Sequence, residues 1–266
     1  MISCISNLAW SHYEEKKVIN ILKKYRIKKL EFSPNLLLKN NFNPKNVKKI
    51  KKKWKKYGFK LYSMQSVLFG IDNAYVFGNK YQNLVFLKEV RKKIKLAKAL
   101  GAKVIVFGSP KNRKTFKKKN NYLNSTFVKT FKKISADCKR NKVNLCLEPN
   151  PKIYKSEYMV NTREASEIAK KIDNPFIKIN LDLGAMIFNK ENIEKVIKNN
   201  MNLIGHAQVS APKLLSLSNY EKQVEVFINS LKKCKYKKTI SLELLGNKKN
   251  NLKNLEKNLK IIKRYL

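Results

Sequence analysis

The sequence is poor in the residues that mark several common classes of protein. Its 266 residues include eight glycines, four cysteines and two histidines. No apolar run approaches the ~18 residues that a membrane-spanning helix needs, and the N-terminus lacks the basic flank of a signal peptide. The cysteines, at positions 4, 138, 146 and 234, have no paired spacing, which argues against a disulfide framework. We therefore expect a cytoplasmic protein with reduced thiols and no membrane contact.

Acidic residues are scarce as well, 18 against 60 basic ones, for a formal net charge of +42. Such a charge favours binding to phosphate backbones through counterion release. The basic residues are mainly lysines, however, and proteins that read bases favour arginine forks and stacking aromatics. The lysine run at 48–56 also fits a solvated helix face, with Val47, Ile50 and Trp54 turned inward at helical spacing. We do not expect specific nucleic-acid binding.

Short apolar segments alternate with helical patterns along the whole chain. The expected strands are residues 1–6, 28–32, 59–65, 103–107, 144–148, 176–181, 203–209 and 239–244. Helical patterns cover 14–25, 122–140, 162–171, 190–199, 219–233 and 251–266, and two more end at Gly58 and Gly101. A doubly wound open sheet would need a glycine-rich phosphate-binding turn, and none is present. The order and the length predict one domain, residues 1–266, that folds as a (β/α)₈ TIM barrel.

Three of the expected strands end on a carboxylate, namely Glu148, Asp182 and Glu243. The C-terminal ends of the strands form the active face of such a barrel. A buried charge is costly unless it is paired, protonated or bound to a metal. Hard oxygen ligands suit manganese, magnesium or cobalt better than a thiolate-type zinc site does. We expect one shared divalent-cation site; the alternative is that each acid pairs with a nearby lysine.

The chain resembles the xylose isomerase-like barrels, the superfamily of sugar phosphate isomerases and epimerases and of endonuclease IV. The resemblance covers essentially the whole sequence. Its most specific pieces are Met64-Gln65-Ser66, Phe107-Gly108-Ser109-Pro110, Leu147-Glu148-Pro149-Asn150-Pro151, Asn180-Leu181-Asp182-Leu183-Gly184 and Gly205-His206-Ala207-Gln208-Val209-Ser210.

The resemblance implies a metal held by Glu148, Asp182, Glu243 and a residue of the seventh strand. The family usually has His-x-His there, and the second position, normally the ligand, is Gln208 in this chain. We prefer Gln208 as fourth ligand, with His206 as the alternative. The implied cofactor is a divalent cation: manganese, magnesium, cobalt or zinc.

The activity implied by the resemblance is that of a metal-dependent sugar or sugar-phosphate isomerase or epimerase. Its two metal-bound glutamates, Glu148 and Glu243, would move protons on opposite faces of an enediolate. Residues near the strand ends would contact the substrate: Trp10, Glu31, Gln65, Lys111, Arg113, Tyr154 and His206. Of these, Arg113 could grip a phosphate or carboxylate with its bidentate fork, and Trp10 could cover an apolar face of a sugar or pack at the rim.

Two other functions stay open at this stage. One is a DNA-repair enzyme of the endonuclease IV type, although two histidines are too few for the histidine-rich, three-metal site that the resemblance would require. The other is a carbohydrate-binding barrel with a degenerate metal site, because Gln208 and Ala185 replace histidines that are frequent in the family. The expected partners are a small sugar or sugar phosphate and a second copy of the chain in a homodimer.

Overall fold

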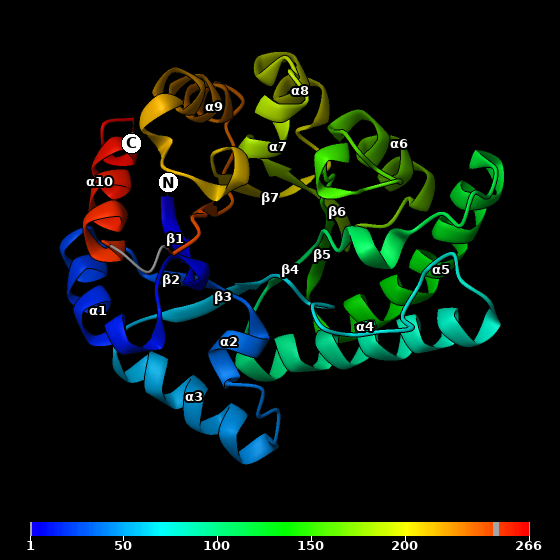
Figure 1. Ribbon diagram of the computed structural model, residues 1–266, viewed down its shortest axis with the longest axis horizontal. Coiled ribbons are helices and arrows are strands. Elements are labelled where there is room, and N and C mark those ends of the chain that lie inside the picture. The colour runs from blue at the N-terminus through cyan, green and yellow to red at the C-terminus, as the bar shows by residue number, and fades with distance from the viewer. Residues whose placement is uncertain (1, 247–249, 266) are drawn as a thin grey trace.

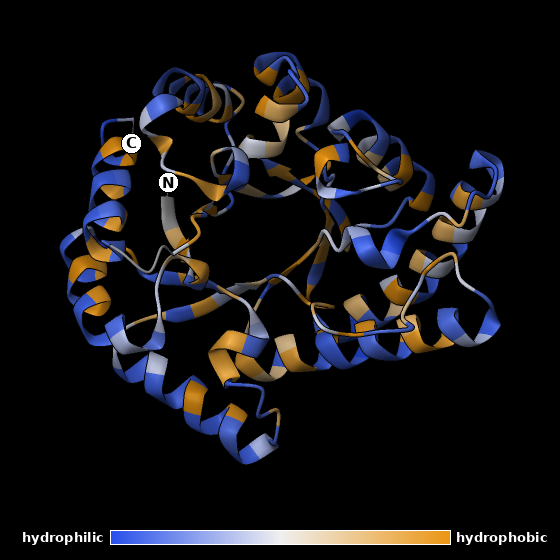
Figure 2. Cartoon of the chain, viewed as in Figure 1, coloured by the Kyte–Doolittle hydropathy of each residue, from blue (hydrophilic) through white to orange (hydrophobic). Residues whose placement is uncertain are grey.

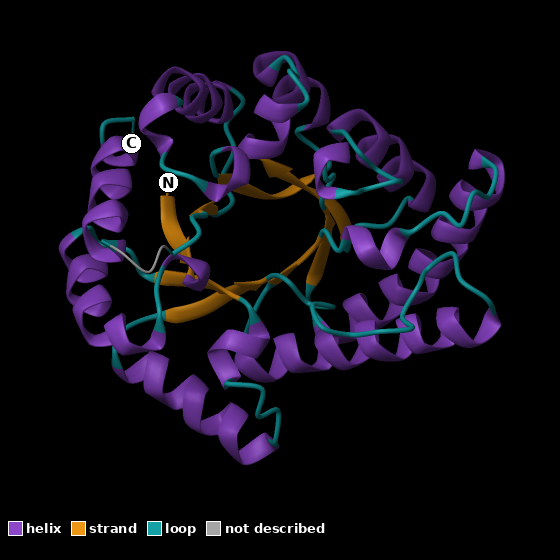
Figure 3. Cartoon of the chain, in the orientation of Figure 1, coloured by secondary structure: helices purple, strands orange, loops and turns teal. Residues whose placement is uncertain are grey.

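Eight short strands close into one parallel barrel, each hydrogen-bonded to the next in chain order and β8 to β1 (Figures 1 and 3). The computed structural model describes residues 2–246 and 250–265. The strands are β1 Ile2–Ser6, β2 Lys29–Phe32, β3 Lys60–Met64, β4 Val104–Phe107, β5 Asn144–Leu147, β6 Ile177–Asp182, β7 Ile204–Val209 and β8 Ile240–Leu242. The predicted (β/α)₈ TIM barrel is confirmed, with every expected strand in place. Met1, expected in the first strand, and Leu266, expected in the last helix, lie outside the described residues.

Helices surround the barrel and separate its strands (Figure 3). They are α1 Glu15–Lys24, α2 Pro34–Leu38, α3 Pro44–Lys56, α4 Lys80–Leu100, α5 Asn120–Asn141, α6 Thr162–Ile172, α7 Leu183–Phe188, α8 Ile193–Asn200, α9 Glu221–Lys233 and α10 Asn251–Lys263. The short helices α2 and α7 were not expected from the sequence. Both follow a strand at its C-terminal end, so they help to shape the active face of the barrel.

The helices turn apolar stripes toward the barrel and basic side chains toward solvent (Figure 2). In α3, Val47 and Trp54 are buried among exposed lysines. Further around the barrel, Phe131 of α5 packs on Phe107 of β4 with ring centroids 5.3 Å apart. This packing fixes the strand ends, and with them the site, on a rigid wall. Within residues 2–246 and 250–265, no helix combines the length and the apolarity needed to cross a membrane.

Candidate active site

A cavity of about 420 Å³ opens at the C-terminal ends of the strands. The carboxylates Glu148, Asp182 and Glu243 line it, from the ends of β5, β6 and β8. Its other polar lining residues are Gln65, Ser66, Ser109, Asn150, Tyr154 and Lys213. The structure therefore brings the three strand-ending acids to one small cavity, together with Gln65 and Tyr154 from the expected substrate contacts.

Glu148 packs closely against the backbone of Gly108. A methyl group at Gly108 would lie 2.1 Å from Glu148 Oε2, so the carboxylate fits only because that residue has no side chain. Asn180 Nδ2 donates to Glu148 Oε1 over 3.1 Å, and Asn150 Nδ2 approaches Oε2 at 3.4 Å. Burial, reinforced by the charge of Asp182, raises the pKa of Glu148 to about 8. A carboxyl group with a pKa this close to neutrality is suited to general acid–base chemistry.

Asp182 is both the last residue of β6 and the N-cap of α7. Its Oδ1 accepts a hydrogen bond from the Ala185 amide over 2.6 Å, and its Oδ2 accepts one from Ser210 Oγ over 2.6 Å. Burial nevertheless raises the pKa of Asp182. Burial and the charges of Asp182, Glu31 and Glu148 raise the pKa of Glu243 well above its ordinary value. The cavity thus gathers three carboxyl groups whose ionisation is costly.

The donor chemistry of the cavity suits a hard divalent cation. Carboxylate oxygens are the ligands that such cations prefer. A bound cation would offset both the burial and the mutual repulsion that raise the pKa values of the three acids. Among the residues that the structure describes, no three Asp, Glu, His or Cys side chains are placed so that together they could hold a metal ion. The three acids fit a cation by type and by electrostatics, and the metal itself remains a proposal.

His206 and Gln208, the two candidate metal ligands on β7, do not line the cavity. Both are fully buried and point to Glu31 across the barrel interior: His206 Nε2 lies 2.8 Å from Glu31 Oε2, and Gln208 Nε2 donates to Oε1 over 2.8 Å. Gln208 Oε1 accepts a hydrogen bond from Asn180 Nδ2, so neither of its amide atoms is free. Burial opposes ionisation of Glu31, but His206 and three hydrogen bonds, the third from Ser63, outweigh it and lower the pKa of Glu31.

This network lies in the interior of the barrel, and none of Glu31, His206 and Gln208 lines the cavity. The predicted substrate contacts of Glu31 and His206 stay a prediction, since both residues lie outside the cavity lining. Their side chains instead bind one another and support Gln208 and Asn180.

Three further predicted substrate contacts, Trp10, Lys111 and Arg113, do not line the cavity either, although Arg113 contacts Asn150 in its wall. Trp10 is buried beside a different surface hollow, next to Ser11 and Tyr13. Lys111 is exposed and pairs with Asp72, its Nζ 2.7 Å from Oδ1. Arg113 is fully buried and donates from Nη2 to Asn150 Oδ1 over 2.5 Å. The turn at Pro110–Arg113 sends the Lys111 side chain out to solvent and the Arg113 side chain inside, so neither lines the cavity, and their grip on a substrate anion stays a prediction.

Several residues at the site were missed at the sequence level. Asn180 lies two residues before Asp182 and so on the same face of β6, a spacing that could have revealed it. Lys213 gave no signal, since lysine is abundant everywhere in the chain. Ser66 and Ser109 line the cavity with left-handed backbones, φ 53° and 45°. Non-glycine residues in this conformation concentrate at functional sites, but only the structure reveals it.

The comparisons with known proteins agree with this architecture. The sequence profile of the xylose isomerase-like TIM barrels matches residues 22–265. The chain belongs to that family. A search of curated protein sequences finds no match for this xylose isomerase-like barrel.

Among solved structures, this xylose isomerase-like barrel is similar to 3-keto-D-glucoside 4-epimerase YcjR from E. coli, with TM-score 0.81, 14% identity, and 99% of this chain and 100% of that chain covered. It is also similar to D-psicose 3-epimerase from Clostridium cellulolyticum H10, with TM-score 0.78, 14% identity and coverages of 100% and 98%. A third similar structure is AP endonuclease, family 2, from Brucella melitensis, with TM-score 0.74, 15% identity and coverages of 95% and 96%. At these identities the likeness shows the fold, and the activity has to be argued from the site.

Proposed function

We propose that this protein is a sugar or sugar-phosphate epimerase or isomerase that moves a proton next to a carbonyl group through an enediolate. One observation carries the proposal: Glu148 and Glu243, two buried carboxyl groups with raised pKa values, face one small polar cavity. Proton transfer at carbon needs a base and an acid held in such a place. The sugar epimerases among the similar structures support this choice of substrate class.

In the proposed reaction, Glu148 and Glu243 act on opposite faces of the substrate. One carboxylate removes the proton from the carbon beside the carbonyl, and the other carboxylic acid returns a proton from its own side, which inverts the configuration. Asn150 and Asn180 hold Glu148 in place by hydrogen bonds. Return of the proton to the neighbouring carbon would give isomerisation instead.

A divalent cation held by Glu148, Asp182 and Glu243 would supply Lewis-acid polarisation of the carbonyl and charge stabilisation of the enediolate. Manganese, magnesium, cobalt and zinc remain the candidates. Gln208 would join the three carboxylates as fourth ligand only by giving up its hydrogen bond with Asn180.

The rest of the cavity suits a polyhydroxylated ligand. The hydroxyls of Ser66, Ser109 and Tyr154 and the amide of Gln65 offer both donors and acceptors. Lys213 adds a cation to the lining, and its backbone amide donates to the Tyr154 hydroxyl over 3.0 Å, which links two loops of the rim. We propose that Lys213 contacts a hydroxyl or phosphate oxygen of the substrate.

A panel of ketoses, aldoses and their phosphates, incubated with the protein and each candidate cation, tests the proposal. We expect one substrate class to be converted to its epimer or isomer, and we expect Glu148→Gln and Glu243→Gln each to lower kcat by roughly 10²–10⁴-fold. Elemental analysis of the same samples should find about one cation per chain in the wild type and much less in both variants.

Glu167→Gln is the matched control, because it removes an exposed carboxylate on α6. It should leave conversion and bound metal unchanged. Conversion that survives in folded Glu148→Gln and Glu243→Gln would contradict the assignment of roles. A wild type that converts nothing in the panel and binds no cation would contradict the proposal as a whole.

A further inference from the structure

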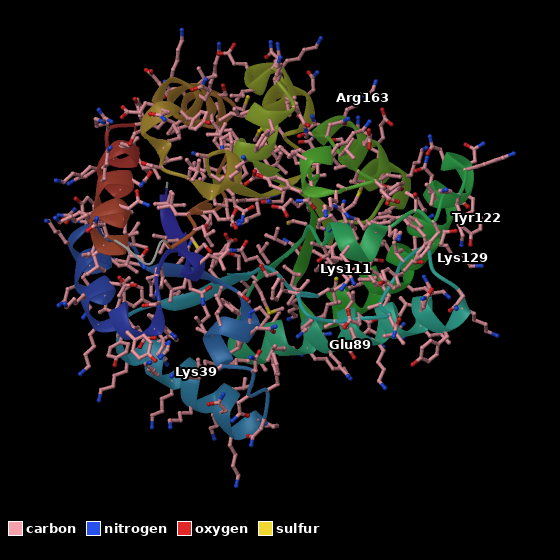
Figure 4. All side chains as sticks on the ribbon, viewed as in Figure 1. Lys39, Glu89, Lys111, Tyr122, Lys129 and Arg163 are labelled. Atoms are coloured by element: carbon pink, nitrogen blue, oxygen red, sulfur yellow. The ribbon has the colours of Figure 1, made fainter. Side chains whose placement is uncertain are left out.

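A second and larger hollow lies on the outside of the barrel, between α3 and α4. This α3–α4 groove has a volume of about 1130 Å³, and its walls include Phe42, Val47, Phe69, Ile71, Lys93 and Leu96. It shares no lining residue with the active-site cavity. In Figure 1 the two helices and α2 lie together along one edge of the molecule, and Glu89, labelled in Figure 4, marks the α4 side.

The groove is apolar and open, and two hydrogen bonds join its walls. Phe69 is 75% exposed and Phe42 is 40% exposed, although aromatic side chains of this size are usually covered. Asn35 Nδ2 donates to the Phe69 carbonyl over 3.3 Å, and Lys51 Nζ donates to the Ala99 carbonyl over 2.8 Å. These bonds tie the walls together, so the groove is built into the fold.

The charges around the groove are almost all positive. Lysines 48, 51, 92, 93 and 95 line it, and its one acidic lining residue, Glu89, pairs with Lys92 with Nζ 2.6 Å from Oε1. Lys93 differs from the others because it is only 8% exposed. Its Nζ lies 4.5 Å from the centroid of the Phe42 ring. Among the described residues no salt bridge or hydrogen bond reaches this Nζ, and the nearby charge of Glu89, which already pairs with Lys92, favours its protonated form only in part.

Most of the Lys93 side chain is covered, and its ammonium group makes no short contact with an anion, which weakens its charged form. The aromatic ring offsets only part of that cost, since the face of a ring attracts a cation more weakly than a full negative charge does. Burial accordingly lowers the pKa of Lys93. An incoming carboxylate or phosphate would supply the missing partner.

We propose that the α3–α4 groove binds a single-chain anionic amphiphile, such as a long-chain carboxylate, whose head pairs with Lys93. The alkyl chain then covers Phe42, Val47, Phe69 and Leu96. A second copy of the chain fits poorly, because two lysine-rimmed surfaces on molecules of charge +42 repel each other. A sugar also fits poorly, since the apolar floor offers few hydrogen-bond partners.

Binding of dodecanoate, measured by titration calorimetry below its critical micelle concentration and at about 150 mM salt, tests this proposal. We expect one site per chain, and at least a tenfold loss of affinity in Lys93→Met, which keeps the buried stem and removes the ammonium group. Leu96→Asn should weaken binding as well, because it makes the floor polar. Dodecyl maltoside, with the same chain and a neutral head, should bind at least tenfold more weakly.

Lys171→Met on α6 is the control for a general attraction to this basic surface, because it removes one exposed charge far from the groove lining. It should bind dodecanoate like the wild type. Equal losses in Lys93→Met and Lys171→Met, or no loss in Lys93→Met, would overturn the proposal. So would association with phosphatidylglycerol vesicles without any binding of monomeric dodecanoate. None of these results depends on the reaction proposed for the barrel cavity.

Discussion

At the scale of single residues, Glu148 is one of three cavity acids whose pKa values burial raises. In the native protein the pKa of Glu148 is about 8, whereas its ordinary value is 4.5. Between pH 4.5 and about pH 8, the folded state therefore keeps a proton on Glu148 that the unfolded state has lost. The contribution of Glu148 to stability is therefore complete below about pH 4.5 and is lost as the pH rises through about 8.

We predict that metal-free Glu148→Gln gains stability over the metal-free wild type as the pH rises. The glutamine cannot ionise, so the variant avoids the growing cost of a buried charge. The difference in free energy of unfolding, measured by urea titration, should shift in favour of the variant by at least about 1 kcal/mol between pH 5 and pH 9, the equivalent of roughly one pKa unit. Glu167→Gln serves as the control for loss of a surface acid. A difference that stays constant or reverses over this range would show that Glu148 ionises freely.

The sequence predicted the cavity acids well and their neighbours poorly. Glu148, Asp182 and Glu243 could be recognised because each ends an apolar strand, and the barrel topology then places strand ends together. The burial of Arg113 could not be recognised from the sequence, because it depends on how one short turn folds. The hydrogen bond that engages Gln208 depends on Asn180 of the neighbouring strand, a contact set by strand register.

At the scale of secondary-structure elements, the junction of β6, α7 and β7 holds Asp182 in place. Ser210, just after β7, donates to Asp182 and accepts from the Gly184 amide over 2.9 Å. A Cβ atom at Gly184 would lie 2.8 Å from both Ser210 Oγ and the Ala211 carbonyl oxygen. The close approach of α7 to the end of β7 therefore requires glycine.

We predict that Gly184→Ala lowers the free energy of unfolding by about 1–3 kcal/mol, the usual cost of overpacking. It should also lower activity, because Asp182 moves with the first turn of α7. Chemical denaturation and the sugar assay provide the two readouts. Gly58→Asn is the matched control: nothing lies within 4 Å of a Cβ atom there, and the φ of +89° is a conformation that asparagine tolerates better than most residues. If Gly184→Ala were as stable as the wild type, the junction would accommodate a methyl group at this position and the prediction would be wrong.

The elements themselves were largely predictable. Every expected strand formed, since apolar runs between turn residues are a strong signal. The helix α7 was missed because Leu183–Phe188 contains a glycine and is shorter than the periodicity needed to recognise a helix. Its N-cap is Asp182 itself, so the residue that we expected only to bind a metal also starts a helix.

At the scale of the whole molecule, a net charge of +42 surrounds an acidic cavity. Basic side chains project from every side, as Lys39, Lys129 and Arg163 illustrate in Figure 4. Such a net charge steers anionic small molecules toward the protein, which suits a sugar phosphate more than a neutral sugar.

The central claim is that Glu148 and Glu243 exchange a proton with the carbon beside a sugar carbonyl. Incubation of the converted sugar in D₂O, followed by NMR, tests it most directly. The wild type should place one deuterium on that carbon for each conversion, because the carboxyl groups exchange with solvent between turnovers, whereas Glu148→Gln and Glu243→Gln should place almost none. Conversion without deuterium in the product, or undiminished exchange in both variants, would contradict the account.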